Sequence, residues 1–242
     1  MGLFSDLKIL YHLALKPVRG KDHAARMENF YAGQAGAYDD FRKRLLKGRQ
    51  ELWNLIDAPA GGTWLDMGGG TGANLDYFGD KLASLGKVYV LDLSHSLLEI
   101  ANKRIAERAW TNVETIEADA TTWRPPTPVD VVTFSYSLTM IPDWFAAIEN
   151  ALAMLRPGGM LGVVDFYVGR KYPAEGRARH GWLTRTFWPT WFAMDNVFPS
   201  PDHLPFLQQH FEPVHLEEHK GKVPYIPFLR MPYYLFVGRK RE

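Results

Sequence analysis

The chain has 242 residues and a formal net charge of +1, with 46% hydrophobic and 23% charged residues. This length and composition favour one globular domain with a sizeable core and exclude a disordered chain. The balanced charge gives no indication of nucleic-acid binding. Cysteine is absent, which excludes disulfides, thiolate metal sites and a cysteine nucleophile. No apolar run reaches the roughly 20 residues that a membrane-spanning helix requires.

Residues 3–16 have the pattern of a helix that is apolar around most of its circumference. One narrow polar stripe runs along it at helical spacing, formed by Ser5, Lys8, His12 and Lys16. A helix of this kind buries its apolar surface in the core of its own protein, in a partner or at a lipid surface. Residues 1–20 are therefore predicted to be an amphipathic helix, and the sequence leaves open whether it contacts the core or a membrane.

Residues 21–60 extend the helical pattern and are predicted to form a helical lid. From residue 61 to residue 166 strands and helices alternate, which is typical of a parallel sheet with helices on both faces. The predicted strands are Thr63–Met67, Lys87–Asp92, Val113–Glu117, Val129–Ser135 and Met160–Phe166. The predicted helices of this part are Ala73–Leu82, Ser96–Arg108 and Phe145–Leu155.

Residues 167–242 are assigned to the same domain, as an insertion followed by two strands at His215–Lys220 and Tyr233–Arg239. The insertion is rich in aromatic and basic residues, which suit the headgroup boundary of an anionic membrane. The alternative is a lid core of aromatic side chains with a solvated basic face. We expect a cytoplasmic protein that lies peripherally on the inner membrane face.

A glycine-rich turn follows the first strand, with Asp66, Gly68, Gly70 and Gly72 at alternate positions. Glycines allow a tight turn and let the backbone approach a ligand at the carboxyl edge of a sheet. An NAD-binding oxidoreductase is the alternative from another class of protein. Its usual spacing is Gly-x-Gly-x-x-Gly, whereas this turn reads Asp-x-Gly-x-Gly-x-Gly.

Polar residues also end the next three strands. Asp92 ends the second strand, where a carboxylate accepts hydrogen bonds from ribose hydroxyls. The competing role of Asp92 as a helix cap is less favoured, because Ser94 is a better cap candidate. Asp119 follows the third strand, where a side chain can meet an adenine amino group. Together these positions predict a nucleoside-binding edge of the sheet.

From Trp64 to Asp165 the chain resembles the class I S-adenosylmethionine-dependent methyltransferases, motif by motif. The resemblance implies a Rossmann-like, doubly wound α/β fold. Its seven-stranded sheet would have an antiparallel last strand, and helices would precede it at the N-terminus. S-adenosyl-L-methionine would be the cofactor, with Asp66 and the glycines of the turn near its methionine part.

The resemblance also implies roles for the other strand ends. Asp92, with its neighbour Leu93, would hold the ribose of the cofactor. Asp119 and Ala120 would contact the adenine. Ser135, at the end of the fourth strand, would line the floor of the site near the methyl group.

The segment Tyr31–Arg49 resembles the matching part of the betaine-lipid methyltransferases, which convert diacylglyceryl-homoserine to its N,N,N-trimethyl form. The resemblance implies that Tyr38 closes over the cofactor, with Tyr31 and Gln34 as neighbours; an ordinary helix surface is the alternative. It implies an N-methyltransferase that acts on a lipid amine and is coupled to an enzyme that makes diacylglyceryl-homoserine. A phospholipid (phosphatidylethanolamine) or quinone methyltransferase is the alternative within the same class.

Methyl transfer from a sulfonium to an amine needs a free amine, alignment at near-attack distance and exclusion of water. No metal is required, and no spacing of residues indicates one. The quaternary ammonium product favours a site walled by aromatic faces, for which the candidates are Tyr31, Tyr38, Tyr136 and Tyr167. Tyr136 is the best placed, because it follows the fourth strand at the sheet edge. An arginine is expected to bind the homoserine carboxylate. Arg42 and Arg230 are the candidates, and the sequence does not distinguish between them.

Overall fold

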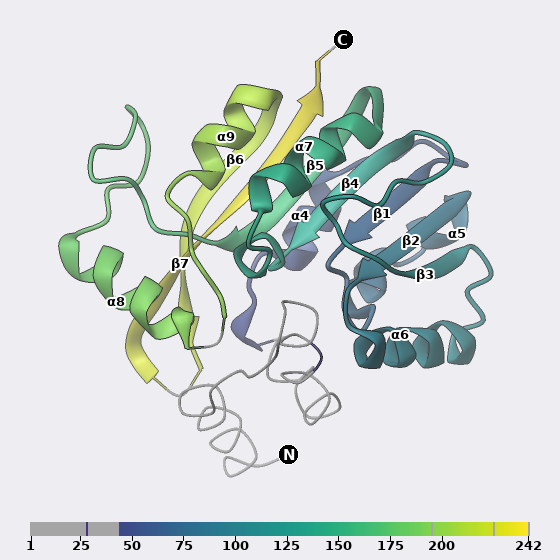
Figure 1. Ribbon diagram of the computed structural model, residues 1–242, viewed down its shortest axis with the longest axis horizontal. Helices are drawn as coiled ribbons and strands as arrows, with labels where there is room; N and C mark the ends of the chain where they lie inside the picture. The colour runs from purple at the N-terminus through teal and green to yellow at the C-terminus, as the bar shows by residue number, and fades with distance from the viewer. Residues whose placement is uncertain (1–27, 29–43, 195, 225, 242) are drawn as a thin grey trace.

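The computed structural model describes residues 28, 44–194, 196–224 and 226–241. Seven strands form one sheet in the order β3-β2-β1-β4-β5-β7-β6 (Figure 1). The strands are β1 (Thr63–Met67), β2 (Lys87–Asp92), β3 (Val113–Glu117), β4 (Val129–Ser135), β5 (Leu155–Phe166), β6 (Phe211–Val223) and β7 (Ile226–Lys240).

Strands β1 to β5 are parallel, and β7 lies antiparallel between β5 and β6. This arrangement confirms the predicted doubly wound sheet with an antiparallel last strand. The strand order reverses between β1 and β4, which lie side by side. In open α/β sheets, ligands bind beyond the carboxyl ends of the strands at such a switch point.

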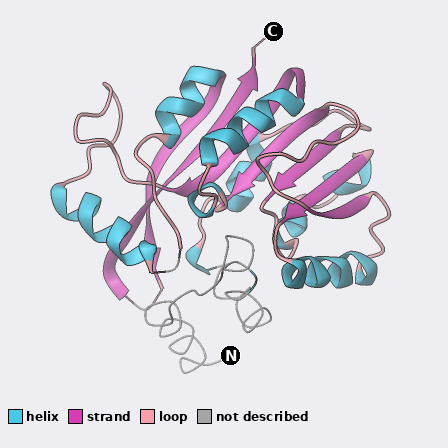
Figure 2. Cartoon of the chain, in the orientation of Figure 1, coloured by secondary structure: helices cyan, strands magenta, loops and turns pink. Residues whose placement is uncertain are grey.

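Helices cover both faces of the sheet (Figure 2). They are α4 (Arg49–Leu55), η1 (Ala73–Tyr77), α5 (Lys81–Ser84), α6 (His95–Glu107), η2 (Leu138–Met140), α7 (Trp144–Met154), α8 (Trp182–Ala193) and α9 (His203–His210). Successive strand residues point to opposite faces, so Val131 and Val132 of β4 enter different cores. One core includes side chains of α4, α6 and α8, and the other includes those of α7 and α9.

Three expectations for local structure were wrong. The single helix predicted at Ala73–Leu82 is the 3₁₀ helix η1 followed by the single turn α5. The break falls at Gly79, whose φ of 54° is incompatible with a continuous helix. The insertion contains helices α8 and α9, although no helix was predicted there, and the two C-terminal strands are longer than predicted and pair along most of their length.

The helix predicted at residues 3–16 and most of the helical lid at residues 21–60 lie outside the described residues. Of the lid, the structure describes Glu28 and the stretch that contains α4. Within the described part of the chain, no helix combines the length and apolar character needed to cross a bilayer.

Gly162 of β5 allows α4 to approach the sheet closely. A Cβ atom at this position would lie 2.3 Å from Cδ1 of Ile56 and 3.3 Å from Cδ1 of Leu52. Ile56 and Leu52 are fully buried, so neither side chain can swing into solvent. The missing side chain at Gly162 therefore sets the distance between α4 and the sheet.

Gly162→Ala should lower the free energy of unfolding by about 1–3 kcal/mol, because a methyl group is forced into a filled core. Ile56→Val deletes the Cδ1 atom that the new methyl would meet, and alone it should cost about 0.5–1.5 kcal/mol. The double variant should therefore lose less stability than the sum of the single variants. Urea unfolding measures all three, and strict additivity would contradict the close contact.

Candidate active site

A cavity of about 250 Å³ opens at the carboxyl ends of β1, β2, β3 and β4. It brings together seven of the residues that the sequence singled out. The predicted residues that line it are Gly68, Gly70, Asp92, Leu93, Asp119, Ala120 and Tyr136. The turn between β4 and α7 supplies further wall residues that the sequence analysis missed, which are Ser137, Met140, Ile141, Pro142 and Asp143.

The glycine-rich turn after β1 forms the floor of this cavity. Gly68 has a φ of 72°, and a Cβ atom there would lie 2.4 Å from Cβ of Ser137. Gly68 is therefore restricted to glycine by its conformation and by its surroundings. Gly70 and Gly72 also have positive φ angles, and Gly72 precedes η1 instead of lining the cavity.

Asp92 fixes the turn from the side of β2. Its Oδ2 accepts a hydrogen bond from the backbone N–H of Gly70 at 2.9 Å, and its Oδ1 accepts one from Ser94 N at 2.9 Å. The cap of α6 is Ser94, whose Oγ accepts a hydrogen bond from Leu97 N. The preference for Ser94 as the cap is therefore confirmed, and Asp92 remains on the cavity wall.

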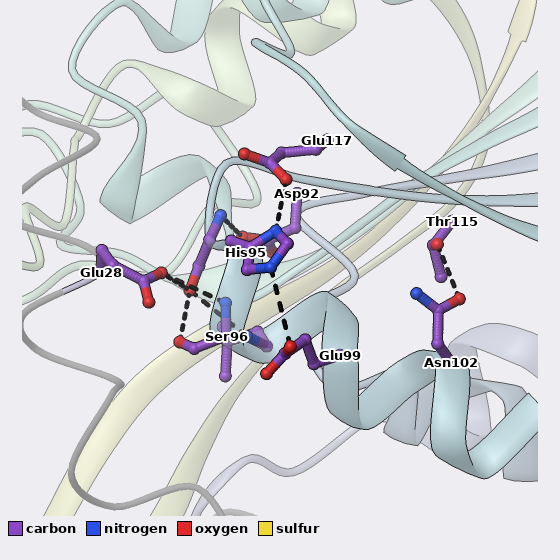
Figure 3. A network of polar contacts seen from close by, with 10 residues as sticks. Glu28, Asp92, His95, Ser96, Glu99, Asn102, Thr115 and Glu117 are labelled. Atoms are coloured by element: carbon purple, nitrogen blue, oxygen red, sulfur yellow. Dashed lines mark hydrogen bonds and ion pairs between the residues drawn. The ribbon is translucent and has the colours of Figure 1, made fainter.

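The start of α6 carries further polar contacts around Asp92 (Figure 3). The carboxylate of Glu28 accepts hydrogen bonds from Ser94 Oγ at 2.8 Å and from Ser96 N at 3.3 Å. His95 lies 2.8 Å from Glu117 at the end of β3, and this contact raises the pKa of the imidazole. These contacts join Glu28 to the start of α6, and the start of α6 to the end of β3.

Asp119 lines the cavity two residues after the end of β3. Its Oδ1 accepts hydrogen bonds from Thr121 N at 2.8 Å and from Thr121 Oγ1 at 2.7 Å. The carbonyl of Ala120 accepts one from Asn150 Nδ2 of α7 at 2.9 Å. The connection after β3 has no helix of its own, and these bonds hold its backbone against the cavity.

Asp66 lies under the turn and is only 2% exposed. Its Oδ1 accepts a hydrogen bond from Thr133 Oγ1 of β4 at 2.9 Å, and its Oδ2 accepts one from Asn74 Nδ2 of η1 at 2.9 Å. Burial raises the pKa of this carboxyl to about 6, although the two hydrogen bonds and the Arg49 guanidinium act in the opposite direction. The carboxylate thus ties β1 to β4 and η1.

A small polar recess adjoins the turn on the side of α4. Ser135 lies there, not in the main cavity, and within the described residues its Oγ is buried without a hydrogen-bond partner. Arg49 of α4 is 6% exposed, and its NH1 lies 3.4 Å from Asn74 Oδ1. Arg49 was not predicted as a site residue, because no motif marks an arginine on the helix before the first strand.

Tyr136 follows β4 in a conformation that side chains rarely adopt, with a φ of 56°. Its hydroxyl donates a hydrogen bond to the backbone carbonyl of Lys47 at 2.6 Å, and its ring lies 4.5 Å from the ring of Phe166. Burial raises the pKa of the phenol well above its ordinary value. Tyr136 thus lines the cavity while its hydroxyl is bound to the backbone of Lys47.

The other predicted site residues either lie outside the described residues or do not line this cavity. Tyr31, Gln34, Tyr38 and Arg42 lie outside the described residues. Arg230 is exposed on β7 and does not line the cavity, and neither does Tyr167.

The comparisons with known proteins agree with this geometry. The family described as "Methyltransferase domain" matches residues 35–214. The chain is 29% identical over 169 residues to the ubiquinone/menaquinone biosynthesis C-methyltransferase UbiE of Pseudomonas fluorescens (strain Pf0-1), a match that covers 67% of this chain and 66% of the relative. The corresponding enzyme of Pseudomonas putida F1 is 28% identical over 162 residues, 64% of this chain and 63% of that protein. The chain therefore spans about two thirds of the length of these curated relatives.

Solved structures share the fold. The N-methyltransferase NodS from Bradyrhizobium japonicum WM9, in complex with S-adenosyl-L-homocysteine, superposes with a TM-score of 0.65 at 16% identity, over 91% of this chain and all of that chain (100%). Phospholethanolamine N-methyltransferase 2 of Haemonchus contortus gives a TM-score of 0.61 at 15% identity, over 86% of this chain and 53% of its own. At these identities the likeness concerns the fold.

The shape and the charge of the cavity lining fit S-adenosylmethionine. The glycine turn lines the cavity at Gly68 and Gly70, and Asp92 ends β2 at the same carboxyl edge of the sheet. Three carboxylates and no basic side chain stand among the described lining residues, which suits a sulfonium. The chain belongs to the methyltransferase domain family and carries an S-adenosylmethionine-dependent methyltransferase domain.

Proposed function

We propose that the protein methylates the amine of a lipid headgroup, and that its reaction is the successive methylation of diacylglyceryl-homoserine to the N,N,N-trimethyl betaine lipid. The observation that carries this proposal is the charge of the cavity. Asp92, Asp119 and Asp143 line it, and the described lining contains no lysine, arginine or histidine. An acidic cavity favours an acceptor that passes through cationic forms over an anionic one.

The cofactor would be held by residues from four elements. Asp92 would accept the ribose hydroxyls, and Asp119 with Ala120 would border the adenine. Asp66 and the glycine turn would lie near the ammonium of the methionine part. Arg49, in the polar recess beside the turn, would pair with the methionine carboxylate. S-adenosylmethionine, when bound, supplies an electrophilic methyl group.

The acceptor would meet the wall that Tyr136 and Met140 form. An aromatic face beside the cavity stabilises an ammonium that gains methyl groups through cation–π attraction. The hydroxyl of Tyr136 already donates to Lys47 O, so this residue would orient the acceptor by its ring and exclude water. Of the three lining carboxylates, Asp92 and Asp119 are assigned to the cofactor. The third, Asp143, would stabilise the positive charge of the amine.

A quinone C-methyltransferase is the second candidate, and the UbiE relatives favour it. The cavity also has apolar walls that could pack against a ring, formed by Leu91, Leu97, Met140, Ile141 and Pro142. The two candidates make different demands on the charge of the site. A carbon acceptor gains nothing from Asp143, whereas an amine does. The lipid proposal also expects coupling to an enzyme that produces diacylglyceryl-homoserine.

Asp92→Ala should weaken the binding of S-adenosylhomocysteine ten-fold or more. The substitution removes the acceptor for the ribose hydroxyls, at a cost of about 1–3 kcal/mol, and it releases Gly70 N from its partner. Titration calorimetry measures the affinity, and circular dichroism shows whether the fold persists. Asp76→Ala, on η1 and away from the cavity lining, is the matched control and should bind normally. An unchanged affinity for Asp92→Ala would remove this residue from the site.

The affinity for S-adenosylhomocysteine should rise with pH between about 5 and 7. The pKa of Asp66 is about 6 in the free protein, and a bound ammonium nearby favours the ionised carboxylate. Binding therefore releases a proton below pH 6, and the affinity should fall on the order of ten-fold from pH 7 to pH 5. Asp66→Asn should flatten this profile. A profile that is equally steep in the variant would place the titrating group elsewhere.

The acceptor is tested by supplying purified protein and S-adenosylmethionine with diacylglyceryl-homoserine, phosphatidylethanolamine or a reduced quinone. Lipid mass spectrometry should show mono-, di- and trimethyl products from diacylglyceryl-homoserine. Asp143→Asn should slow this methylation, and the loss should be larger for the last step, whose product keeps its positive charge, than for the first step, whose product can release a proton. Methylation of the quinone alone, with Asp143→Asn fully active, would replace the lipid proposal by the second candidate.

A further inference from the structure

Helix α8 exposes a face that carries no charged residue. The residues on this face lie within about 140° of one another at helical spacing, and they are Trp182, Leu183, Thr186, Phe187, Thr190, Ala193 and Met194. Trp182 is 69% exposed and Leu183 72% exposed. Tyr172 and Phe198, at the two ends of the same insertion, are also exposed. A helix face on which so many neighbouring apolar side chains are exposed indicates an interaction site.

The opposite face of α8 packs against the wall of the cavity. Phe192 stacks on Phe166 at 4.9 Å between ring centroids, and Phe166 in turn contacts Tyr136 at 4.5 Å. The segment after α8 is also attached, because Phe198 N donates to Thr139 O of η2 at 2.7 Å. Two stacked rings, those of Phe192 and Phe166, thus lie between the exposed face of α8 and Tyr136 of the acceptor wall.

The distal end of the β6–β7 hairpin adds positive charge on the same side of the molecule as α8 (Figure 1). Ile226 and Leu229 of this hairpin pack against the core cluster that contains Trp188 and Phe192 of α8. Between residues 219 and 241 the sequence contains no acidic residue. Phe228 is 96% exposed.

Two exposed cations of the hairpin face each other directly. Lys222 of β6 is paired with Arg230 of β7 in the antiparallel register, and the described residues give neither an acidic partner. Like charges opposite each other destabilise a strand pair in water. An anionic surface relieves this repulsion, so the pair indicates what this side of the molecule contacts.

We propose that the exposed face of α8 and the hairpin residues Lys222, Phe228 and Arg230 form a docking surface for an anionic lipid bilayer. The aromatic and aliphatic side chains enter the headgroup boundary, and the cations contact anionic headgroups. This inference rests on the proposed function, because docking at a membrane serves an enzyme whose substrate is a lipid. Docking through α8 brings the acceptor wall close to the membrane. The charge complementarity of the hairpin selects a bilayer over a second copy of this equally cationic surface.

The test measures sedimentation with vesicles of phosphatidylcholine, either alone or mixed with phosphatidylglycerol. The full chain should bind the anionic vesicles and bind the neutral ones weakly. The triple variant Trp182→Gln, Leu183→Gln, Phe187→Gln should lose binding ten-fold or more. Lys222→Gln with Arg230→Gln should reduce binding to the anionic vesicles by roughly five-fold or more, and it should reduce the dependence on salt. Phe145→Gln with Val214→Gln changes two exposed apolar residues elsewhere and should bind as the unaltered protein does.

A water-soluble acceptor separates this inference from the proposed function. Glyceryl-homoserine without acyl chains should be methylated equally by the unaltered protein and the triple variant, because the cavity is unchanged. Vesicle binding without methylation of any homoserine acceptor would overturn the proposed function and leave the docking surface standing. The docking surface would be overturned if the triple variant bound vesicles as well as the unaltered protein does. It would also be overturned if light scattering showed a dimer for the unaltered protein and a monomer for the triple variant.

Discussion

The carboxylate of Asp66 is the contact on which the arrangement of the site depends. It lies in the interior at the end of β1 and accepts hydrogen bonds from β4 and from η1. Thr133, one of its donors, also accepts from Trp64 Nε1 at 3.0 Å, so the bonds extend into the aromatic core on the α4 side. A buried carboxylate is costly unless hydrogen bonds satisfy it. Thr133 of β4 and Asn74 of η1 supply these hydrogen bonds. They hold the end of β1 in place, and with it the glycine turn that follows.

Acidic groups dominate the edge of the sheet where the parallel strands end. Asp92 serves the local structure and the cavity together, because its carboxylate both secures the glycine turn through Gly70 N and faces the lining. Asp119 does the same at β3 with Thr121. The backbone geometry and the electrostatic character of the cavity therefore share the same side chains. A substitution at either aspartate alters the shape of the site as well as its charge.

The sequence predicted the core of this site because its signals are local. Strand ends, a glycine turn and single aspartates are readable from spacing, and the sheet brought Gly68, Asp92 and Asp119 together as expected. Other parts depend on packing across the chain and carry no local signal. Arg49 approaches the turn only because α4 packs over β5 at Gly162. Likewise Ser135 turns into the recess while Tyr136 lines the cavity, a division set by the positive φ of Tyr136.

The position of β7 has a consequence for how the chain assembles during synthesis. β7 is made after β6, yet it lies between β5 and β6 in the sheet. Until β7 emerges from the ribosome, β5 has an unpaired edge, and β6 has no strand of the main sheet to join. Strands β1 to β5 can pair first, because the hydrogen bonds between these five strands need nothing from later residues. During synthesis the β5 edge is therefore unpaired until β7 is made, and an unpaired strand edge is a site of edge-to-edge aggregation.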